Sequence, residues 1–258
     1  MSNYNAETWK QFSGSWGIEP IYELEKECWA PWLAASQKSL SGRAEVFPSG
    51  QLCLSAGKIV LASLSLNRVD WDGDPANLPC WDDVAGDPTD YSQTYVSDGN
   101  TLCLMSMNVS PEARGLRLPS VLIESVKDYA SEAGVLNVIG SFRPSGYGST
   151  VLEASQSHLS VPTFDEYVKT VNAKGESIDP WLRSLFKNGM RELSIDHQAM
   201  SVPITKEEFG EFHQPNWRMI ELEGQQIWCC GETGFFFALP DGNYIYKEKN
   251  VWGRISNE

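Results

Sequence analysis

The clearest hydrophobic pattern in the chain lies in residues 101–134, where a strand pattern is followed by a helix pattern. Residues 101–109 are mostly apolar, as in a buried strand, and Arg114 and Gly115 then lie in a short turn. The next apolar positions are spaced as on one face of a helix: Leu122, Val126, Tyr129, Ala130 and Ala133. The segment therefore predicts a strand, a tight loop and one amphipathic helix.

Proline and glycine predict the two ends of this helix. Pro119 suits the first helical position, where its missing N–H costs nothing, and Gly134 suits the position just after the last turn. A loop that leads from a strand into a helix N-terminus presents unpaired amides and the positive end of the helix dipole, which together bind phosphate. One interpretation of the segment is therefore an anion site. The other is a purely structural strand–helix unit, which any α/β protein contains.

Comparable patterns predict the elements along the rest of the chain. Residues 46–47 lead into a turn and then a hairpin, whose strands 51–54 and 59–66 are joined at Gly57. The other predicted strands are residues 135–142, 191–195, 226–230, 235–239 and 244–252, the last as an edge or hairpin strand. Residues 143–148 are predicted as a loop, and the predicted helices are 17–39 (interrupted at Pro31), 164–171, 179–188 (with Asp179 as N-cap) and a short helix after Thr205. Strands and helices mixed in this way, with hairpins at both ends, make the fold class α/β or α+β.

Composition excludes several classes of function. The chain has 258 residues and a formal net charge of −14, which argues against nonspecific binding to nucleic acid or to an anionic membrane surface. No apolar run approaches the roughly 18 residues that a spanning helix needs, and the first ten residues lack the charged and apolar regions of a signal peptide. We therefore expect one compact, cytoplasmic domain without a nucleic-acid or membrane partner.

Neither the cysteines nor the acidic residues indicate a metal site. The cysteines show no C-x-x-C pair and no histidine at zinc-ligand spacing: Cys28, Cys53, Cys80, Cys103, Cys229 and Cys230. Residues 70–74 (DWDGD) resemble a calcium loop only superficially, because glycine falls at position 4 rather than 6 and Trp81 stands where a chelating Glu belongs. We therefore expect no metal and interpret residues 70–74 as a solvated acidic turn.

The order of hairpin, central strand, Pro-x-x-Arg-Gly loop, amphipathic helix and next strand resembles the GNAT acyltransferase superfamily. The chain resembles in particular the longer GNAT-like proteins with FPEGQ-, RPSGY- and NVW-type motifs. The matching segments occur in the same order over about residues 45–254: FPSGQ at 47–51, VDW at 69–71, CW at 80–81 with AG at 85–86, RPSGY at 143–147, DPWLR at 179–183, MSV at 200–202 and NVW at 250–252. The resemblance implies a mixed central sheet with splayed strands, in a single GNAT-like domain over residues 1–258. Its core would span about 18–200 and a strand-rich C-terminal extension about 201–258.

GNAT proteins hold acyl-CoA between the splayed strands, so the resemblance implies where it would bind here. Backbone groups of Met107, Asn108 and Val109 would contact pantetheine. The pyrophosphate would be held by the next loop and helix N-terminus, at Arg114, Gly115, Leu116, Arg117, Leu118 and Ser120. The acceptor substrate would contact Trp81, Thr94, Arg143 and Ser145. The implied co-substrate is acetyl-CoA or another acyl-CoA, the acceptor is a small-molecule amine or a carrier-protein thiol, and a homodimer is compatible with the resemblance.

The loop departs from the family pattern in two places. The usual loop reads Arg/Gln-x-x-Gly-x-Gly/Ala, whereas this chain has Arg117 in the first glycine place and Pro119 in the second. Pro119 removes one amide donor. Arg117 either crowds the pyrophosphate or offsets the lost donor with a charge-assisted contact. The related long-form proteins also tend to carry a Thr-His pair where this chain has Thr94 and Tyr95, so a histidine acid or base is absent at that point.

Acyl transfer to an amine requires a base for the ammonium proton and an acid for the departing thiolate. Tyr95 and Tyr147 are candidate catalytic acids, because the resemblance places each in a loop near the acyl-CoA site. Alternatively, each caps an edge of the core with its hydroxyl outward. The acidic side chains of residues 67–100 either attract a cationic amine or are simply solvated: Asp82, Asp83, Asp87 and Asp90. We interpret the histidines as surface or helix-capping residues: His158, His197 and His213.

Three hypotheses remain open from the sequence. The first is an acyl-CoA-dependent N-acyltransferase that acts on a small amine by direct transfer. The second is a GNAT-like thioester enzyme, a decarboxylase or an S-acyltransferase to a carrier protein, which the missing histidine disfavours. The third is a non-catalytic GNAT-like binding protein, which the altered glycine loop motivates.

Overall fold

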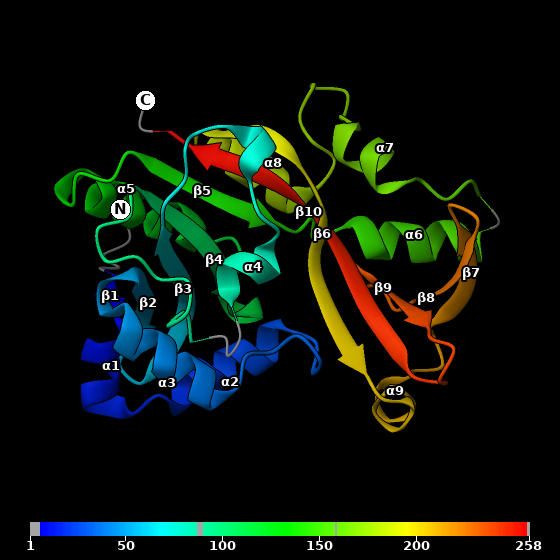
Figure 1. Ribbon diagram of the computed structural model, residues 1–258, viewed down its shortest axis with the longest axis horizontal. Helices are drawn as coiled ribbons and strands as arrows, with labels where there is room; N and C mark the ends of the chain where they lie inside the picture. The colour runs from blue at the N-terminus through cyan, green and yellow to red at the C-terminus, as the bar shows by residue number, and fades with distance from the viewer. Residues whose placement is uncertain (1–5, 87–89, 158, 257–258) are drawn as a thin grey trace. The chain divides into compact units, whose positions relative to one another are not determined.

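The computed structural model describes residues 6–86, 90–157 and 159–256. The chain forms two compact units (Figure 1). Unit 1 comprises Met1–Gly140 with Arg254–Glu258, and unit 2 comprises Ser141–Gly253. Ten strands and nine α-helices in the described residues give a mixed α/β fold, as the sequence predicts. Residues 201–253 belong to the same unit as residues 141–200. The strand-rich C-terminal extension expected from about residue 201 stays a prediction.

Unit 1 contains a sheet in the order β1-β2-β3-β4-β5. Its strands are β1 Glu7–Thr8, β2 Gln51–Ala56, β3 Ile59–Val69, β4 Thr101–Val109 and β5 Asn137–Phe142, whose last two residues belong to unit 2. Neighbouring strands are antiparallel except for β4 and β5, which are parallel. The predicted hairpin is confirmed, with Gly57 at a φ of 63° in its turn. Val46, which was predicted to lead into the turn before the hairpin, is the last residue of a helix.

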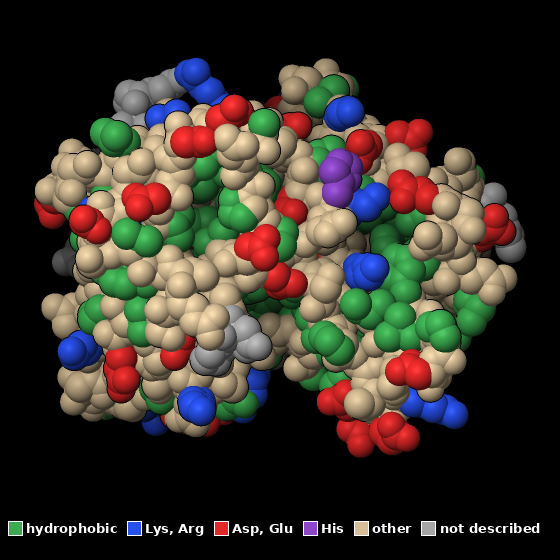
Figure 2. Space-filling model, viewed as in Figure 1, with side chains coloured by type: hydrophobic (Ala, Val, Ile, Leu, Met, Phe, Trp, Pro, Cys, Tyr) green, Lys and Arg blue, Asp and Glu red, His purple; other side chains and the backbone are tan. Residues whose placement is uncertain are grey.

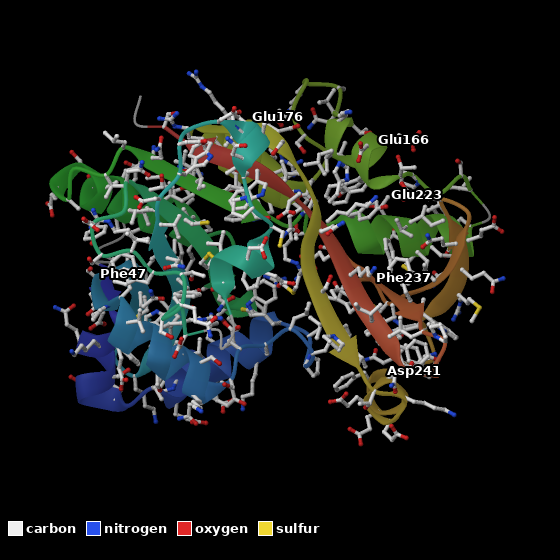
Figure 3. All side chains as sticks on the ribbon, viewed as in Figure 1. Phe47, Glu166, Glu176, Glu223, Phe237 and Asp241 are labelled. Carbon is white, nitrogen blue, oxygen red and sulfur yellow. The ribbon has the colours of Figure 1, made fainter. Side chains whose placement is uncertain are left out.

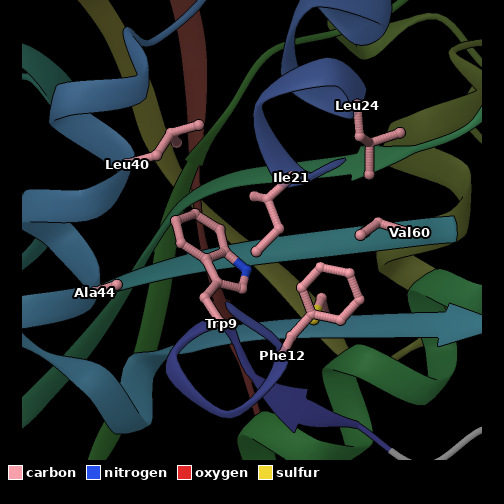
Figure 4. Close-up of a cluster of buried hydrophobic side chains, with 8 residues drawn as sticks. Trp9, Phe12, Ile21, Leu24, Leu40, Ala44 and Val60 are labelled. Atoms are coloured by element: carbon pink, nitrogen blue, oxygen red, sulfur yellow. The ribbon is translucent and has the colours of Figure 1, made fainter. Parts of the chain in front are cut away.

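Three N-terminal helices pack beside this sheet: α1 Trp9–Trp16, α2 Glu19–Cys28 and α3 Gln37–Val46. They enclose a cluster of buried side chains that includes Trp9, Phe12 and Leu40 and reaches Cys53 on β2 and Val60 on β3 (Figure 4). Helix α1 begins with a capping box, in which Thr8 and Gln11 each bond the other's backbone amide. The predicted interruption at Pro31 is confirmed, because α2 and α3 are separate helices on either side of it.

Helix α5 (Leu118–Glu132) is the helix predicted after the β4 strand. Pro119 lies in its first turn, and Gly134 follows its end with a φ of 64°. Leu122, Val126 and Ala130 are buried, as their spacing predicts, and the helix contacts β2, β3 and β4. Strand β4, the loop and α5 therefore form the unit expected from the hydrophobic pattern.

The acidic connection between β3 and β4 is anchored to the sheet by polar groups. It contains the 3₁₀ helix η2 Pro75–Asn77 and the short helix α4 Trp81–Ala85. Tyr91 is fully buried, and its hydroxyl lies 2.8 Å from Ser65 Oγ on β3. Asp72 and Asp74 are exposed, so the solvated acidic turn is confirmed. The expectation for Asp87 lies outside the described residues.

Unit 2 contains an antiparallel sheet in the order β10-β9-β8-β7, with β6 paired to β10. These strands are β6 Met190–Ile204, β7 Arg218–Leu222, β8 Gln225–Cys229, β9 Phe235–Ala238 and β10 Tyr244–Ile255, whose last two residues belong to unit 1. The helices are α6 Tyr147–Gln156, α7 Phe164–Lys169, α8 Pro180–Lys187 and α9 Lys206–Phe212. Asp179 caps α8 and Thr205 caps α9, as predicted.

The sequence prediction for unit 2 missed one helix and one strand. Tyr147 and Gly148 begin helix α6 instead of ending a loop, and this helix was missed because glycine and β-branched residues lower its helix propensity. Gly148 is required there, because a Cβ would overlap the carbonyl of Glu232. Strand β10 was predicted as an edge or hairpin strand, and its antiparallel pairing with β9 confirms the hairpin alternative. Strand β7 was missed because it is largely exposed and shows little alternation.

Candidate functional site

Strand β4 is interrupted by a bulge in the middle of unit 1. Ser65 of β3 pairs with Ser106, but the next residue, Leu66, pairs with Leu104, so Met105 is the extra residue. The carbonyl oxygen of Met105 accepts a hydrogen bond of 3.0 Å from the indole Nε1 of Trp81, the first residue of α4. The bulge is thus held in place by Trp81, for which the resemblance implies a contact with the acceptor substrate.

Beyond the bulge, β4 is paired on one side only. Its parallel register with β5 ends at Leu104, opposite Gly140, whereas its pairing with β3 continues to Val109. Because alternate residues of a strand direct their N–H and C=O groups to opposite neighbours, about half of residues 105–109 present both groups away from β3. Ser110 donates its amide to Leu61 of β3, so Asn108, two residues earlier, also faces β3 and pairs with Ser63. Within the described residues of unit 1, β4 therefore offers a backbone edge at Met107 and Val109.

The side chain of Asn108 is already engaged in a buried polar network. Its Nδ2 donates to Glu25 Oε2 at 2.7 Å, and its Oδ1 accepts from the Trp29 indole at 2.6 Å. Glu25 on α2 is only 3% exposed, and burial raises the pKa of its carboxyl group, against the hydrogen bonds from Ala35 and Asn108 that lower it. The side chain of Asn108 is therefore not available to a ligand.

The loop after β4 presents backbone amides together with two arginines. It begins with the 3₁₀ helix η3 Pro111–Ala113 and ends at Arg117, the N-cap of α5. The amides of Ser120 and Val121 are bonded to the carbonyl of Arg117, but those of Gly115, Arg117 and Leu118 have no acceptor within the described chain. Gly115 and Arg117 are exposed, whereas Leu118 is buried. The exposed amides just before a 15-residue helix form a site suited to an anion.

The backbone of Arg117 adopts the conformation that glycine favours. Its φ is 59° and its ψ 26°, in the left-handed region, so the chain follows a glycine-like path at the position where the proteins that its loop resembles have glycine. Arg114 and Arg117 are both exposed, and neither has a carboxylate partner among the described residues. Pro119 lies in the first turn of α5, where an amide has no partner within the helix. The residues present therefore fit a pyrophosphate despite the altered motif.

Tyr95 and Thr94 both lie in unit 1 but differ in their hydrogen bonding. The Tyr95 ring packs against Phe47, labelled in Figure 3, with 5.1 Å between ring centroids, and its hydroxyl forms no hydrogen bond with the described residues. The Thr94 hydroxyl donates to the carbonyl of Val84 at 2.7 Å and accepts from Asn67 at 2.9 Å. Thr94 thus connects β3 with α4, and Tyr95 keeps a hydroxyl that can serve a ligand.

The remaining predicted site residues belong to unit 2. Arg143 forms salt bridges with Glu248 at 2.8 Å and with Glu232 at 3.2 Å. Burial lowers the pKa of the Arg143 guanidinium, but Glu248, Tyr246 and Glu232 outweigh burial and keep this pKa raised. Ser145 is exposed. Tyr147 is 2% exposed, its hydroxyl donates to the carbonyl of Pro162 at 3.3 Å, and burial raises the pKa of its phenol, which weakens it as an acid. These contacts favour structural roles for Arg143 and Tyr147, while the expected contact of Arg143 with substrate and the catalytic role of Tyr147 stay predictions.

Two features of the unit 1 site were not predicted from sequence. The bulge at Met105 leaves no signal in an apolar run, because one extra residue does not change the composition of the strand. Glu25 lies in the polar segment ELEKE of residues 23–27, where a solvent-facing charge is the default expectation. Only its three-residue spacing from Tyr22 and from Cys28 would have indicated a half-buried helix face.

Comparisons with known proteins identify the fold. No protein-family model matches the chain. Two solved structures match it over nearly its whole length: the loading GNATL domain of CurA from Lyngbya majuscula (TM-score 0.62, 17% identity, 99% of this chain and 98% of that one) and the GNAT-like decarboxylase GphF in complex with isobutyryl-CoA (TM-score 0.62, 19% identity, 98% of each chain). The chain thus has a GNAT-like fold.

A curated relative gives a weaker likeness. The chain is 26% identical over 185 residues, or 69% of its own length, to a probable hydrolase, YhcX, of Bacillus subtilis (strain 168). It spans only 33% of that protein, so most of the relative has no counterpart here. In the described part of the chain, no helix combines the length and hydrophobicity needed to cross a membrane.

Proposed function

We propose that unit 1 binds acyl-CoA along β4 and that the protein transfers the acyl group to a small amine. The observation that carries this proposal is the continuity of the binding surface. The one-sided edge of β4 ends at Val109, and eight residues later the unbonded amides of Arg117 and Leu118 begin helix α5. Acetyl-CoA is the proposed donor.

The two parts of this surface suit the two parts of CoA. Pantetheine carries amide groups that can pair with a free strand edge, as an added peptide strand does. The pyrophosphate would accept hydrogen bonds from the amides of Gly115, Arg117 and Leu118, and Arg114 would add a charge-assisted contact. The loop amides lack an acceptor in the described chain, so pyrophosphate binding there breaks no existing hydrogen bond.

The proposed reaction needs one proton taken up and one released. The amine nitrogen attacks the thioester carbonyl carbon, the N–C bond forms and the C–S bond breaks, giving an amide and free CoA. The nitrogen loses one proton to water, and the departing thiolate takes one from the Tyr95 hydroxyl, whose phenolate is then reprotonated by solvent. A backbone N–H on the β4 edge would stabilise the oxyanion during the attack.

A second candidate is thioester chemistry towards a carrier-protein thiol, with or without decarboxylation. It is favoured by the two structures that match the whole chain, since one is a loading domain and the other a decarboxylase in complex with isobutyryl-CoA. A non-catalytic binding protein is the third. The three differ in what happens to the thioester: transfer to an added amine, transfer or decarboxylation without an amine, or no consumption.

Calorimetric titration tests the shared claim first. CoA, acetyl-CoA and malonyl-CoA are titrated into the wild type, into Arg114→Ala, and into the control Lys10→Ala, an exposed lysine on α1. We expect micromolar binding that is about tenfold weaker in Arg114→Ala, equivalent to about 1.4 kcal/mol, and unchanged in the control. Release of free thiol is then followed with and without an amine panel. If none of the three ligands binds, the proposal fails.

A further inference from the structure

Unit 2 contains a pocket of about 200 Å³ that the proposed function does not use. It is lined by residues from β7, β8, β9 and β10, from β6, and from helices α6 and α7. Figure 2 shows hydrophobic side chains exposed at the right of the view with basic side chains beside them, and Figure 3 labels two residues of the lining, Phe237 and Glu223.

The pocket has an aromatic wall. Its apolar lining comprises Tyr147, Phe164, Leu222, Ile227, Phe235 and Phe237. The ring of Tyr147 packs edge-on against Phe164, with centroids 5.2 Å apart, and against Phe235 at 5.8 Å. Such rings are fixed by their mutual contacts, so the wall is preformed, and rings of this kind bind a further aromatic ring in stacked or edge-on geometry.

One cation in the pocket lining, Lys247, has no carboxylate partner among the described residues. Of the two carboxylates in the lining, Glu223 is paired with Lys249 at 3.3 Å, and Glu248 is paired with Arg143 at 2.8 Å. Lys247 lies in the lining and is exposed, with its Nζ 5.7 Å from the centroid of the Phe237 ring. Among the described residues it has no carboxylate partner, so the charge that the pocket still offers to a ligand is positive.

We propose that this pocket binds a small aromatic carboxylate, with the ring against Phe235 and Phe237 and the carboxylate on Lys247. The size agrees, because a cavity of about 150 Å³ accommodates benzene and this one, at about 200 Å³, leaves room for a carboxylate. The chemistry agrees as well: an apolar wall with one unpaired cation discriminates against neutral aromatics and against polar anions alike. All of its lining residues belong to unit 2, whereas the proposed acyl-CoA contacts belong to unit 1.

Fluorine NMR with 4-fluorobenzoate tests the proposal on the full chain. The variant Lys247→Met keeps most of the side-chain length and removes the charge, and the matched control is Lys206→Met, an exposed lysine on α9 outside the pocket. We expect saturable binding to the wild type and to Lys206→Met, and at least tenfold weaker binding to Lys247→Met. The neutral analogue 4-fluorobenzamide should bind the wild type at least tenfold more weakly than the benzoate and should bind Lys247→Met no differently.

Backbone amide shifts locate the ligand. Saturating benzoate should shift signals of the lining residues on β8, β9 and β10 and leave those of the β4–α5 loop unchanged. The Arg114→Ala variant should bind benzoate as the wild type does, which separates this proposal from the acyl-CoA proposal. Absence of saturable binding, equal binding to Lys247→Met, or shifts confined to unit 1 would each overturn the assignment.

Discussion

Replacing Arg117 by glycine tests whether the altered loop keeps a glycine-like conformation under strain. Arg117 has a φ of 59°, is exposed, and has no ion-pair partner among the described residues, so the substitution removes no native contact of its side chain. The left-handed conformation costs an L-residue about 1–2 kcal/mol. Glycine removes that cost but adds about 0.5–1 kcal/mol of conformational entropy to the unfolded chain. We therefore expect Arg117→Gly to be more stable by about 0.5–1 kcal/mol.

The alanine variant separates backbone strain from charge. Arg117→Ala loses the guanidinium group but keeps the Cβ, so it should retain the strain and match the wild type in stability. Thermal unfolding is a suitable assay, because 1 kcal/mol moves the Tm of a protein of this size by about 2–4 °C. If Arg117→Gly is no more stable than Arg117→Ala, the strain argument is wrong.

The same pair of variants decides how Arg117 affects CoA. If the guanidinium contacts the pyrophosphate, both variants should bind CoA about tenfold more weakly, as for the loss of one exposed charge-assisted hydrogen bond. Tighter binding by both variants would instead mean that Arg117 crowds the site. Calorimetry on the two variants therefore distinguishes the two interpretations that the sequence leaves open.

Three further predictions concern the reaction and the stability of unit 1. Tyr95→Phe should lower kcat by at least about 100-fold without changing acetyl-CoA affinity; an unchanged kcat would exclude Tyr95 as the acid. Burial raises the folded-state pKa of Glu25 above 4.5, so the folded protein binds its proton more tightly and stability is lost as the pH rises from 4.5 through the raised pKa. In urea unfolding, the stability of Glu25→Gln should depend less on pH over this window than that of the wild type. An identical pH dependence of stability would contradict the assignment. Phe12 is 1% exposed, so Phe12→Ala should cost about 3–5 kcal/mol in chemical denaturation, and a loss below 1 kcal/mol would mean that the cluster in Figure 4 is poorly packed.

The sequence predicts the β4–α5 unit well because several local signals agree there. An apolar strand, a turn with Gly115, Pro119 in the first helical turn and Gly134 after the last all favour the same structure. Helix α6 was missed for the opposite reason: Gly148 disfavours a helix, but its close approach to the Glu232 carbonyl requires it. Tertiary contact thus overrides local propensity at that position.

The candidate site is only partly visible in the sequence. The loop residues Arg114–Ser120 are adjacent in the chain, so a motif can identify them. Glu25, Trp29 and Asn108 are brought together from residues more than 75 positions apart, and the hydrogen bond from Trp81 to Met105 joins a helix to a bulge. Such long-range pairs follow from the packing of α2 and α4 on β3 and β4 and from the register of these strands, which no local pattern specifies.

Amide hydrogen exchange with and without acetyl-CoA tests the central claim most directly. The amides of Gly115, Arg117 and Leu118 have no acceptor in the described chain, whereas those of Ser120 and Val121 are bonded to the Arg117 carbonyl and serve as internal controls. If the pyrophosphate binds at this loop, exchange at Gly115, Arg117 and Leu118 should slow on addition of acetyl-CoA much more than at the two controls. Bound acetyl-CoA that leaves these three amides exchanging as before would contradict the account.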